Sequence, residues 1–291
     1  MLIITNPGDK VVIFSPFYEN YGADTILSGS EPIYVPLVPP EFHFDKEKLE
    51  DAFRQGAKAL ILCNPSNPCG KVFTMEEMQT IAELAKKYDA YVVTDEVYEH
   101  IVYAPYKHIY MQSLEGMRER TIVCNSLSKT YSITGWRLGY VIANPQIIDR
   151  VKKVHDFLTV GAAAPLMEAA VVGLEFGDGY YDELAAHYAH MKEVFVGGLK
   201  KLGLKYTDPQ GAYYVLVDVS EFGVKDDVKF CEWMAQFVGV AAVPGSSFFR
   251  EDVHNLVRFH FAKQDDTLNE AIKRLATLKE KAINAKNVDW R

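Results

Sequence analysis

Residues 59–98 read ALILCNPSNPCGKVFTMEEMQTIAELAKKYDAYVVTDEVY. Two apolar runs of strand length, ALILC and YVVT, flank a stretch whose apolar residues recur every three to four positions, as in an amphipathic helix. Thr74 and Glu77 precede the apolar face of that stretch and predict a capping box at the start of the helix. We therefore expect a strand, a helix and a second strand, the alternation that is typical of an α/β fold with a parallel sheet.

The same alternation extends to both sides of this segment. A further helix is expected after Asp45, because Leu49, Ala52 and Phe53 fall on one helical face. Near-continuous apolar strands indicate a sheet that is covered on both faces, so we predict an α/β fold with a mostly parallel sheet and helices on both sides. The other runs of strand length are KVVIFSP (10–16), EPIYVPL (31–37), TIVCNSLS (121–128) and LGYVIA (138–143).

The pattern changes after about residue 150, where long helical stretches begin. They are followed by shorter strand-like runs, among them GAYYVLVDV and LVRFHFA, and by a charged amphipathic helix at the end of the chain. This order is typical of a second, smaller unit. We predict a large domain over residues 1–180 and a smaller α+β domain over residues 181–291.

The composition excludes several classes of partner. The chain has 291 residues, 48% of them hydrophobic and 24% charged, with a net charge of −8, which disfavours binding to nucleic acid and to anionic lipid. No segment approaches the roughly 20 apolar residues of a membrane span. The cysteines show no CxxC spacing and favour reduced thiols and a cytoplasmic location. They are Cys63, Cys69, Cys124 and Cys231.

Polar side chains follow three of the predicted strands, where each strand ends. In an open α/β sheet, ligands bind beyond the carboxyl ends of the strands. Each residue alone also has a structural explanation: an Asn-Pro turn, a helix cap at Asp95, or a surface lysine at Lys129. Their coincidence at one edge of the sheet favours a functional site. The residues are Asn64, Asn67, Asp95, Tyr98, Ser126, Ser128 and Lys129.

This combination matches the chemical demands of pyridoxal phosphate. A neutral lysine amine such as that of Lys129 forms a Schiff base with an aldehyde, and a buried carboxylate such as that of Asp95 keeps a pyridine nitrogen protonated. Donors are available for the phenolic oxygen of the cofactor in Asn67 and Tyr98. Ser126 and Arg137 offer a hydroxyl group and a guanidinium group for its phosphate.

Six motifs resemble, in order, those of the class I and II aminotransferases, which are pyridoxal phosphate enzymes of fold type I. The resemblance runs through nearly the whole chain and implies an enzyme that moves an amino group from an L-amino acid to a 2-oxo acid by a ping-pong mechanism, with 2-oxoglutarate as the expected acceptor. The motifs are NPSNPCG (64–70), TDEVY (94–98), SLSKTYSITGWRLGY (126–140), GAYY (211–214), VPGSSFF (243–249) and VRFHFA (257–262).

The resemblance also assigns roles to single residues. Lys129 would bind the cofactor and move the proton at the substrate carbon, while Asp95 would bind the ring nitrogen. Asn67 and Tyr98 would contact the phenolic oxygen, and Ser126 with Arg137 would contact the phosphate. Two further assignments are Tyr18, stacked on the ring, and Arg258, holding the substrate carboxylate. Tyr18 also suits an ordinary core position, and no metal site is expected because His187 and His190 lie on a polar helix face.

The amino-terminal region of the family has no counterpart in this sequence, which begins at MLIITNPGD. We therefore expect weaker cofactor binding and a homodimer that relies on the large domain. Two other functions remain open: a lyase or synthase of the same fold, and an inactive binding or oligomerisation module. The amino acid donor also remains open among acidic, aromatic and small neutral side chains.

Overall fold

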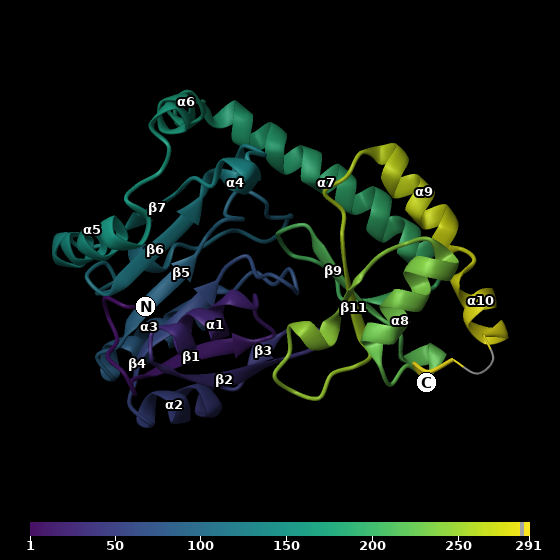
Figure 1. Ribbon diagram of the computed structural model, residues 1–291, viewed down its shortest axis with the longest axis horizontal. Helices are drawn as coiled ribbons and strands as arrows, with labels where there is room; N and C mark the ends of the chain where they lie inside the picture. Colours follow the sequence, from purple (N-terminus) through teal and green to yellow (C-terminus); the bar gives the residue numbers. More distant parts are fainter. Residues whose placement is uncertain (286–287) are drawn as a thin grey trace.

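Two sheets organise this protein, as seen in a computed structural model that describes residues 1–285 and 288–291. Figure 1 shows the larger sheet on the side of the amino terminus and the smaller sheet beside α8 and α9. The larger sheet has seven strands in the order β3-β2-β1-β4-β5-β6-β7. They are β1 (Lys10–Ser15), β2 (Glu31–Val38), β3 (His43–Phe44), β4 (Ala57–Cys63), β5 (Tyr91–Asp95), β6 (Thr121–Ser126) and β7 (Gly139–Ile142).

The larger sheet is mostly parallel, as predicted. The central strands β2, β1, β4, β5 and β6 pair in parallel, and the edge strands β3 and β7 are antiparallel to their neighbours. All six apolar runs of the first half form strands of this sheet. The predicted α/β fold class is therefore confirmed.

The smaller sheet has four antiparallel strands in the order β10-β11-β9-β8. They are β8 (Lys205–Tyr206), β9 (Tyr214–Asp218), β10 (Val243–Pro244) and β11 (Leu256–His260). The 24-residue helix α7 (Asp178–Lys201) runs from the region of α6 toward this sheet and packs against α9 (Figure 1). The predicted domain boundary at residues 180 and 181 falls in the first turn of α7, and the division itself stays a prediction.

Helices cover both faces of the larger sheet. One apolar cluster joins alternate strand residues such as Phe14 and Leu62 to Met78 of α3, and another joins Val11 and Ile13 on the opposite face to Tyr21 of α1. The remaining helices are α1 (Asn20–Leu27), α2 (Lys46–Arg54), α3 (Met75–Lys87), α4 (Leu127–Thr130), α5 (Pro145–Thr159), α6 (Ala164–Leu174), α8 (Asp227–Trp233), α9 (Asp265–Leu275) and α10 (Leu278–Asn284). Over the described residues, no helix is both long enough and apolar enough to cross a bilayer.

Helix α3 begins with the predicted capping box. The Thr74 hydroxyl accepts a hydrogen bond from the Glu77 amide at 3.2 Å, and the Glu77 carboxylate accepts one from the Thr74 amide at 2.9 Å. Two amides that the helix itself leaves without partners are thereby satisfied. Glu77 also pairs with the buried ammonium of Lys71 at 2.9 Å, so the cap is tied to the chain segment that leads into the helix.

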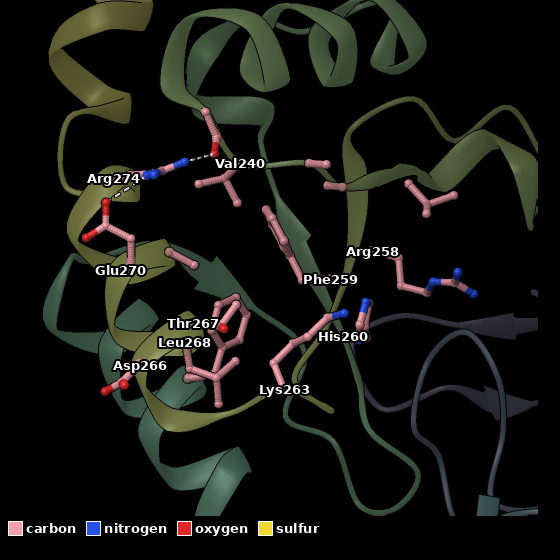
Figure 2. Close-up of a pocket in the computed structure, with 16 residues that line it drawn as sticks. Val240, Arg258, Phe259, His260, Lys263, Asp266, Thr267, Leu268, Glu270 and Arg274 are labelled. Atoms are coloured by element: carbon pink, nitrogen blue, oxygen red, sulfur yellow. Dashed lines mark hydrogen bonds and ion pairs between the residues drawn. The ribbon is translucent and has the colours of Figure 1, made fainter. Parts of the chain in front are cut away.

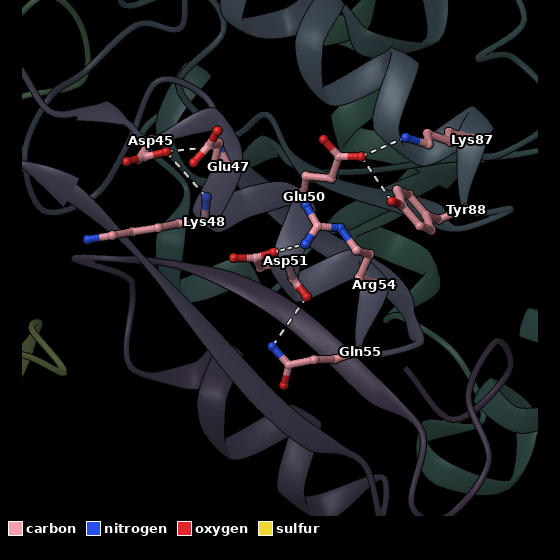
Figure 3. A network of polar contacts seen from close by, with 9 residues as sticks. All are labelled: Asp45, Glu47, Lys48, Glu50, Asp51, Arg54, Gln55, Lys87 and Tyr88. Carbon is pink, nitrogen blue, oxygen red and sulfur yellow. Dashed lines mark hydrogen bonds and ion pairs between the residues drawn. The ribbon is translucent and has the colours of Figure 1, made fainter.

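A polar network joins α2 to the end of α3 (Figure 3). Asp45 caps α2 by accepting a hydrogen bond from the Glu47 amide at 2.8 Å. One carboxylate oxygen of Glu50 accepts hydrogen bonds from the Lys87 ammonium at 2.6 Å and from the Tyr88 hydroxyl at 2.9 Å. These contacts hold α2 and α3 side by side on one face of the sheet.

Candidate active site

The polar residues at the strand ends lie along one edge of the larger sheet. The strands β4, β5 and β6 are parallel neighbours, so their last residues meet at the same edge. The backbone register places Asp95 between Cys63 of β4 and Cys124 of β6. We call this edge, together with the residues that directly follow the three strands, the carboxyl edge.

Asp95 is the last residue of β5 and lies against α1. Its carboxylate accepts a hydrogen bond of 2.6 Å from the Tyr21 hydroxyl and one of 3.3 Å from the Val97 amide. Burial raises the pKa of Asp95, while the hydrogen bond from Tyr21 and the charge of Lys129 act in the opposite direction. The carboxylate is thus held in place but only partly compensated, which suits it to pair with a cationic ligand.

The contact from Tyr21 is a feature that the sequence analysis missed. Tyr18, the neighbouring tyrosine in SPFYENYG, carries the predicted stacking role. It is 37% exposed, and its ring meets that of Tyr21 edge-on with 5.7 Å between the ring centres. The signal for Tyr21 is its position in the first turn of α1, where its ring packs onto the sheet. No contact with Asp95 could be read from residues 74 positions apart.

Lys129 lies in α4, the short helix that follows β6 directly. The Ser126 hydroxyl accepts a hydrogen bond from the Ser128 amide at 3.1 Å and so starts this helix. The Lys129 ammonium lies 5.9 Å from the centre of the Tyr213 ring, which belongs to the segment before β9. Burial lowers the pKa of Lys129, the positive charge of Arg137 lowers it further, and Asp95 acts against both. The neutral amine is therefore favoured relative to a lysine in water.

Hydroxyl groups and a guanidinium group flank Lys129. The Ser126 hydroxyl donates to that of Ser128 at 2.7 Å. Arg137 has a left-handed backbone with φ of 57°, and its exposed guanidinium donates to the Thr134 carbonyl at 2.8 Å. This arrangement leaves the Arg137 side chain accessible to an anion, although the structure does not bring it into contact with Ser126 or Ser128 within the described residues.

Gly139 explains how the chain returns so closely to the carboxyl edge after Arg137. A side-chain carbon at this position would lie 2.6 Å from the Asn125 carbonyl oxygen of the paired strand β6. Only glycine allows that approach of two backbones without a shift. The requirement lies two residues after Arg137 and fixes the path of the segment that carries it.

Arg258 connects the smaller sheet to the carboxyl edge. Its guanidinium donates a hydrogen bond of 2.7 Å to the side-chain oxygen of Asn67, a residue 191 positions away. The same group lies 4.5 Å from the ring centre of Tyr214 and 4.2 Å from that of Phe248. The Tyr214 hydroxyl in turn lies 2.8 Å from that of Tyr98, which is buried. Asn67, Tyr98 and Arg258 therefore form one continuous cluster.

A cavity of about 610 Å³ lies beyond Arg258, between β11, α9 and residues 239–243 (Figure 2). In this view the guanidinium of Arg258 points away from Thr267 and Leu268, which line the other side of the cavity. The contact with Asn67 places this group next to the carboxyl edge. Arg258 therefore borders both this cavity and the carboxyl edge.

A second cavity, of about 700 Å³, opens on the face of the larger sheet between the amino-terminal residues, α1 and α5. Asp95 and Tyr21 lie on its border, and the rest of the lining is mostly apolar. We call this cavity the sheet-face groove. Within the described chain, Asp95 therefore faces this groove on one side.

His190, read from the sequence as a solvated residue, is exposed on α7. Its Nε2 lies 2.9 Å from an Asp265 carboxylate oxygen at the start of α9. The hydrogen bond and charge of Asp265 raise the pKa of His190. The pair links α7 to the start of α9.

Comparison with known proteins adds a family match. The family model described as aminotransferase class I and II matches residues 1–275. A probable N-succinyldiaminopimelate aminotransferase of Mycobacterium tuberculosis is 34% identical over 293 residues, covering 97% of this chain and 74% of that protein. The methionine aminotransferase of Escherichia coli is 33% identical, covering 93% of this chain and 70% of its own length. The kynurenine–oxoglutarate transaminase 3 of Rattus norvegicus is 34% identical, covering 92% of this chain and 66% of its own length.

Solved structures agree with these sequence matches. The N-succinyldiaminopimelate aminotransferase of Mycobacterium tuberculosis superposes with a TM-score of 0.91 at 34% identity and covers 95% of this chain and 73% of its own. An aromatic aminotransferase from Pyrococcus horikoshii superposes with a TM-score of 0.90 at 32% identity. The match covers 97% of this chain and 76% of that one. The likeness includes both sheets, because nearly the whole chain is covered.

Proposed function

This chain belongs to the class I and II aminotransferase family, and we propose that the reaction takes place at the carboxyl edge, around Lys129 and Asp95. It is a pyridoxal phosphate-dependent aminotransferase that acts on an amino acid and a 2-oxo acid. The aminotransferase names of the relatives support group transfer over the lyase and the inactive module. One observation carries the location: Asp95 is the last residue of β5, and Lys129 lies in the short helix that directly follows β6, the parallel neighbour of β5.

The polar groups of the carboxyl edge fit this cofactor. Among the described residues, the side-chain nitrogen of Asn64 and the hydroxyl of Thr94 are buried there without a hydrogen-bond partner, so the edge has unused polar groups. When bound, pyridoxal phosphate supplies an aldehyde and an electron-withdrawing ring. In our proposal Asp95 holds the ring nitrogen and Lys129 the aldehyde carbon. Ser126 and Arg137 hold the phosphate.

Lys129 and Asp95 have complementary roles: Lys129 supplies a neutral amine and Asp95 a negative charge. Burial and Arg137 lower the pKa of the Lys129 amine, which leaves its electron pair available to bond to carbon and to accept a proton from the substrate α-carbon. Asp95 provides a negative charge that the Tyr21 hydroxyl keeps oriented. A carboxylate fixed in this way stabilises a protonated nitrogen more strongly than a freely solvated one does.

The remaining predicted residues hold the reactants. Asn67 and Tyr98 offer polar groups for the phenolic oxygen, and each is already oriented by a hydrogen bond, from Arg258 and with Tyr214 respectively. Tyr18 is proposed to stack on the ring, a role supported by its edge-on contact with Tyr21, whose hydroxyl binds Asp95. These contacts would restrict the ring to one plane and one orientation.

Arg258 is proposed to bind the α-carboxylate of the substrate. A guanidinium group suits a bidentate pair with a carboxylate, and the rings of Tyr214 and Phe248 keep that of Arg258 from turning into water. We further propose 2-oxoglutarate as the acceptor, which agrees with the name of the kynurenine–oxoglutarate relative. The donor is open, because the relatives carry names that refer to three different amino acids.

The location is tested by substituting the lysine. Lys129→Ala should remove the visible absorbance of the lysine-bound cofactor, and borohydride reduction of the wild type should label the peptide that contains Lys129. Lys152→Ala, an exposed lysine of α5, serves as the matched control and should keep the wild-type spectrum. An unchanged spectrum in Lys129→Ala, or a label on another peptide, would place the cofactor elsewhere.

We also propose that the protein is a cytoplasmic homodimer. Large apolar side chains at the end of α5 are exposed: Phe157 at 92%, Leu158 at 69% and Val160 at 82%. A contiguous apolar surface of this kind is typical of an interface, and a second copy of the chain offers the same surface. All four cysteines are free, which suits a reducing compartment.

A further inference from the structure

A second polar cluster lies next to the carboxyl edge, on the chain segment between β5 and β6. It consists of Glu96, Glu99 and His108. One ligand atom from each of the three lies within 4.8 Å of the other two. The side chains of Glu96, His108 and Glu99 are 2%, 6% and 11% exposed. None of these residues has a role in the proposed reaction.

His108 lacks the partners that a buried imidazole normally has. Among the residues that the structure describes, neither of its ring nitrogens has a hydrogen-bond partner. A Glu96 carboxylate oxygen lies 3.5 Å from Nε2, a distance that is too long for a good hydrogen bond. The Tyr110 ring packs edge-on against the His108 ring, with 4.5 Å between the ring centres. A buried polar ring in this state lacks a ligand or a proton-sharing partner.

The negative charge of the cluster is also poorly compensated. Glu99 accepts a hydrogen bond of 2.5 Å from the Asn125 amide and lies 3.6 Å from His100. Within the described chain, no lysine or arginine forms a salt bridge with Glu96 or Glu99. Two carboxylates removed from water destabilise a fold unless a cation accompanies them. The cluster thus combines a missing positive charge with an imidazole that has a free electron pair.

We propose that Glu96, Glu99 and His108 bind one divalent transition-metal ion. Carboxylate oxygens and an imidazole nitrogen together suit Zn²⁺ and Mn²⁺. Ligands about 2.0–2.2 Å from a tetrahedral ion lie roughly 3.4 Å from one another. The 3.5 Å between the Glu96 and His108 atoms, too long for a hydrogen bond, is therefore the separation that two ligands of one ion have. Glu99 completes three protein ligands after a small side-chain movement, and water fills the remaining position.

The ion would join the two ends of a segment that otherwise contains little regular structure. Glu96 directly follows β5 and Glu99 lies three residues further on, whereas His108 lies three residues before the short 3₁₀ helix at Met111–Ser113. Tyr98 lies between the two glutamates. Binding would therefore restrain the chain that carries Tyr98 and stabilise the fold, without the ion touching the reacting atoms.

A proton is the alternative source of the missing charge. A protonated His108 between the two glutamates would need no metal, and addition of a chelator would then change nothing. The two explanations are separable by measurements that do not involve catalysis. The site is also independent of the proposed function, because metal content and unfolding temperature do not require pyridoxal phosphate.

The test compares metal binding by the holoenzyme and its variants. After EDTA treatment and removal of the chelator, the wild type should bind one equivalent of Zn²⁺ or Mn²⁺ by titration calorimetry and gain several degrees in unfolding temperature. Glu96→Gln and His108→Gln should each weaken binding at least tenfold, the range seen when a ligand shell is disturbed. His190→Gln, which alters the exposed pair with Asp265, is the matched control and should bind as the wild type does.

A spectroscopic measurement on the wild type covers the case in which a variant fails to fold. Pulsed electron paramagnetic resonance of the Mn²⁺-loaded enzyme should show coupling to one imidazole nitrogen. Three results would overturn the proposal: no binding by the wild type, binding that His108→Gln leaves unchanged, or binding that His190→Gln removes. Absence of the nitrogen coupling would overturn it as well.

Discussion

The buried carboxylate of Asp95 lowers the stability of the cofactor-free fold and provides the charge that the proposed reaction needs. Its carboxylate is buried at a strand end with a tyrosine hydroxyl and a backbone amide as partners. Burial nevertheless dominates and raises its pKa, so the folded protein without cofactor holds an anion that it stabilises less well than water does. A cationic ring nitrogen would remove that cost. The same residue is therefore expected to destabilise the empty protein and to stabilise the loaded one.

This reasoning gives a prediction with a defined sign. Because the folded pKa of Asp95 lies above the unfolded value of 3.8, the folded state binds more protons in that interval, and stability falls as the pH rises through it. Asp95→Asn should therefore raise the unfolding temperature of the cofactor-free protein at pH 8, on the order of 2 °C, and the gain should shrink toward pH 4. The measurement is differential scanning fluorimetry across pH.

The control for this prediction is Asp149→Asn, an exposed aspartate of α5, which should change little at any pH. In the presence of pyridoxal phosphate the order should reverse, because the Asn variant loses the charge that holds the ring nitrogen. A lower unfolding temperature for cofactor-free Asp95→Asn at pH 8 would show that the contacts from Tyr21 and Val97 outweigh the cost of burial.

At the scale of elements, α3 illustrates a helix whose start was predictable in detail. Thr74 and Glu77 are close in sequence, and their reciprocal hydrogen bonds depend only on local geometry. The apolar face of α3 and the flanking strands follow from the same short-range pattern. Local signals of this kind predicted the fold class correctly.

Thr74→Ala should lower the free energy of unfolding by about 1 kcal/mol, because the Glu77 amide loses its acceptor. Urea unfolding followed by circular dichroism measures this change. Thr74→Ser keeps the hydroxyl and should recover most of the stability. Equal midpoints for the Ala variant and the wild type would mean that solvent replaces the cap at no cost.

The contacts that the sequence did not reveal are long-range. Tyr21 meets Asp95, and Arg258 meets Asn67, only because packing of α1 and of the smaller sheet brings distant segments together. No local spacing rule encodes such pairs. The unpaired ring of His108 is likewise invisible in the sequence, since its neighbours are set by the path of the segment after β5. Residue types could be predicted at the site, but their partners could not.

At the scale of the whole molecule, exposed apolar surface is the feature that calls for a partner. Phe157, Leu158 and Val160 at the end of α5 are exposed, and Leu158 also lines the sheet-face groove together with the exposed Leu27. Both surfaces lie on the larger sheet, next to the carboxyl edge. Association of two copies there would shield apolar area and cover the neighbourhood of the site at the same time.

The double variant Phe157→Asp and Leu158→Asp should shift the protein from dimer to monomer in size-exclusion chromatography with light scattering at micromolar concentration. Charged groups at the centre of an apolar interface lose their hydration and disfavour association. Lys153→Glu, an exposed change on the same helix, should leave the dimer intact. A wild type that is monomeric at this concentration would contradict the proposed assembly.

The hydrogen bond between Arg258 and Asn67 has a consequence for how fast a substrate is recognised. A guanidinium that already holds a neutral amide oxygen at 2.7 Å can exchange it for a charged oxygen with little reorientation. The exchange breaks the hydrogen bond to Asn67, so binding of a carboxylate would release the loop after β4 from Arg258. An amine without a carboxylate would leave the hydrogen bond between Arg258 and Asn67 intact, and we expect the enzyme not to turn it over.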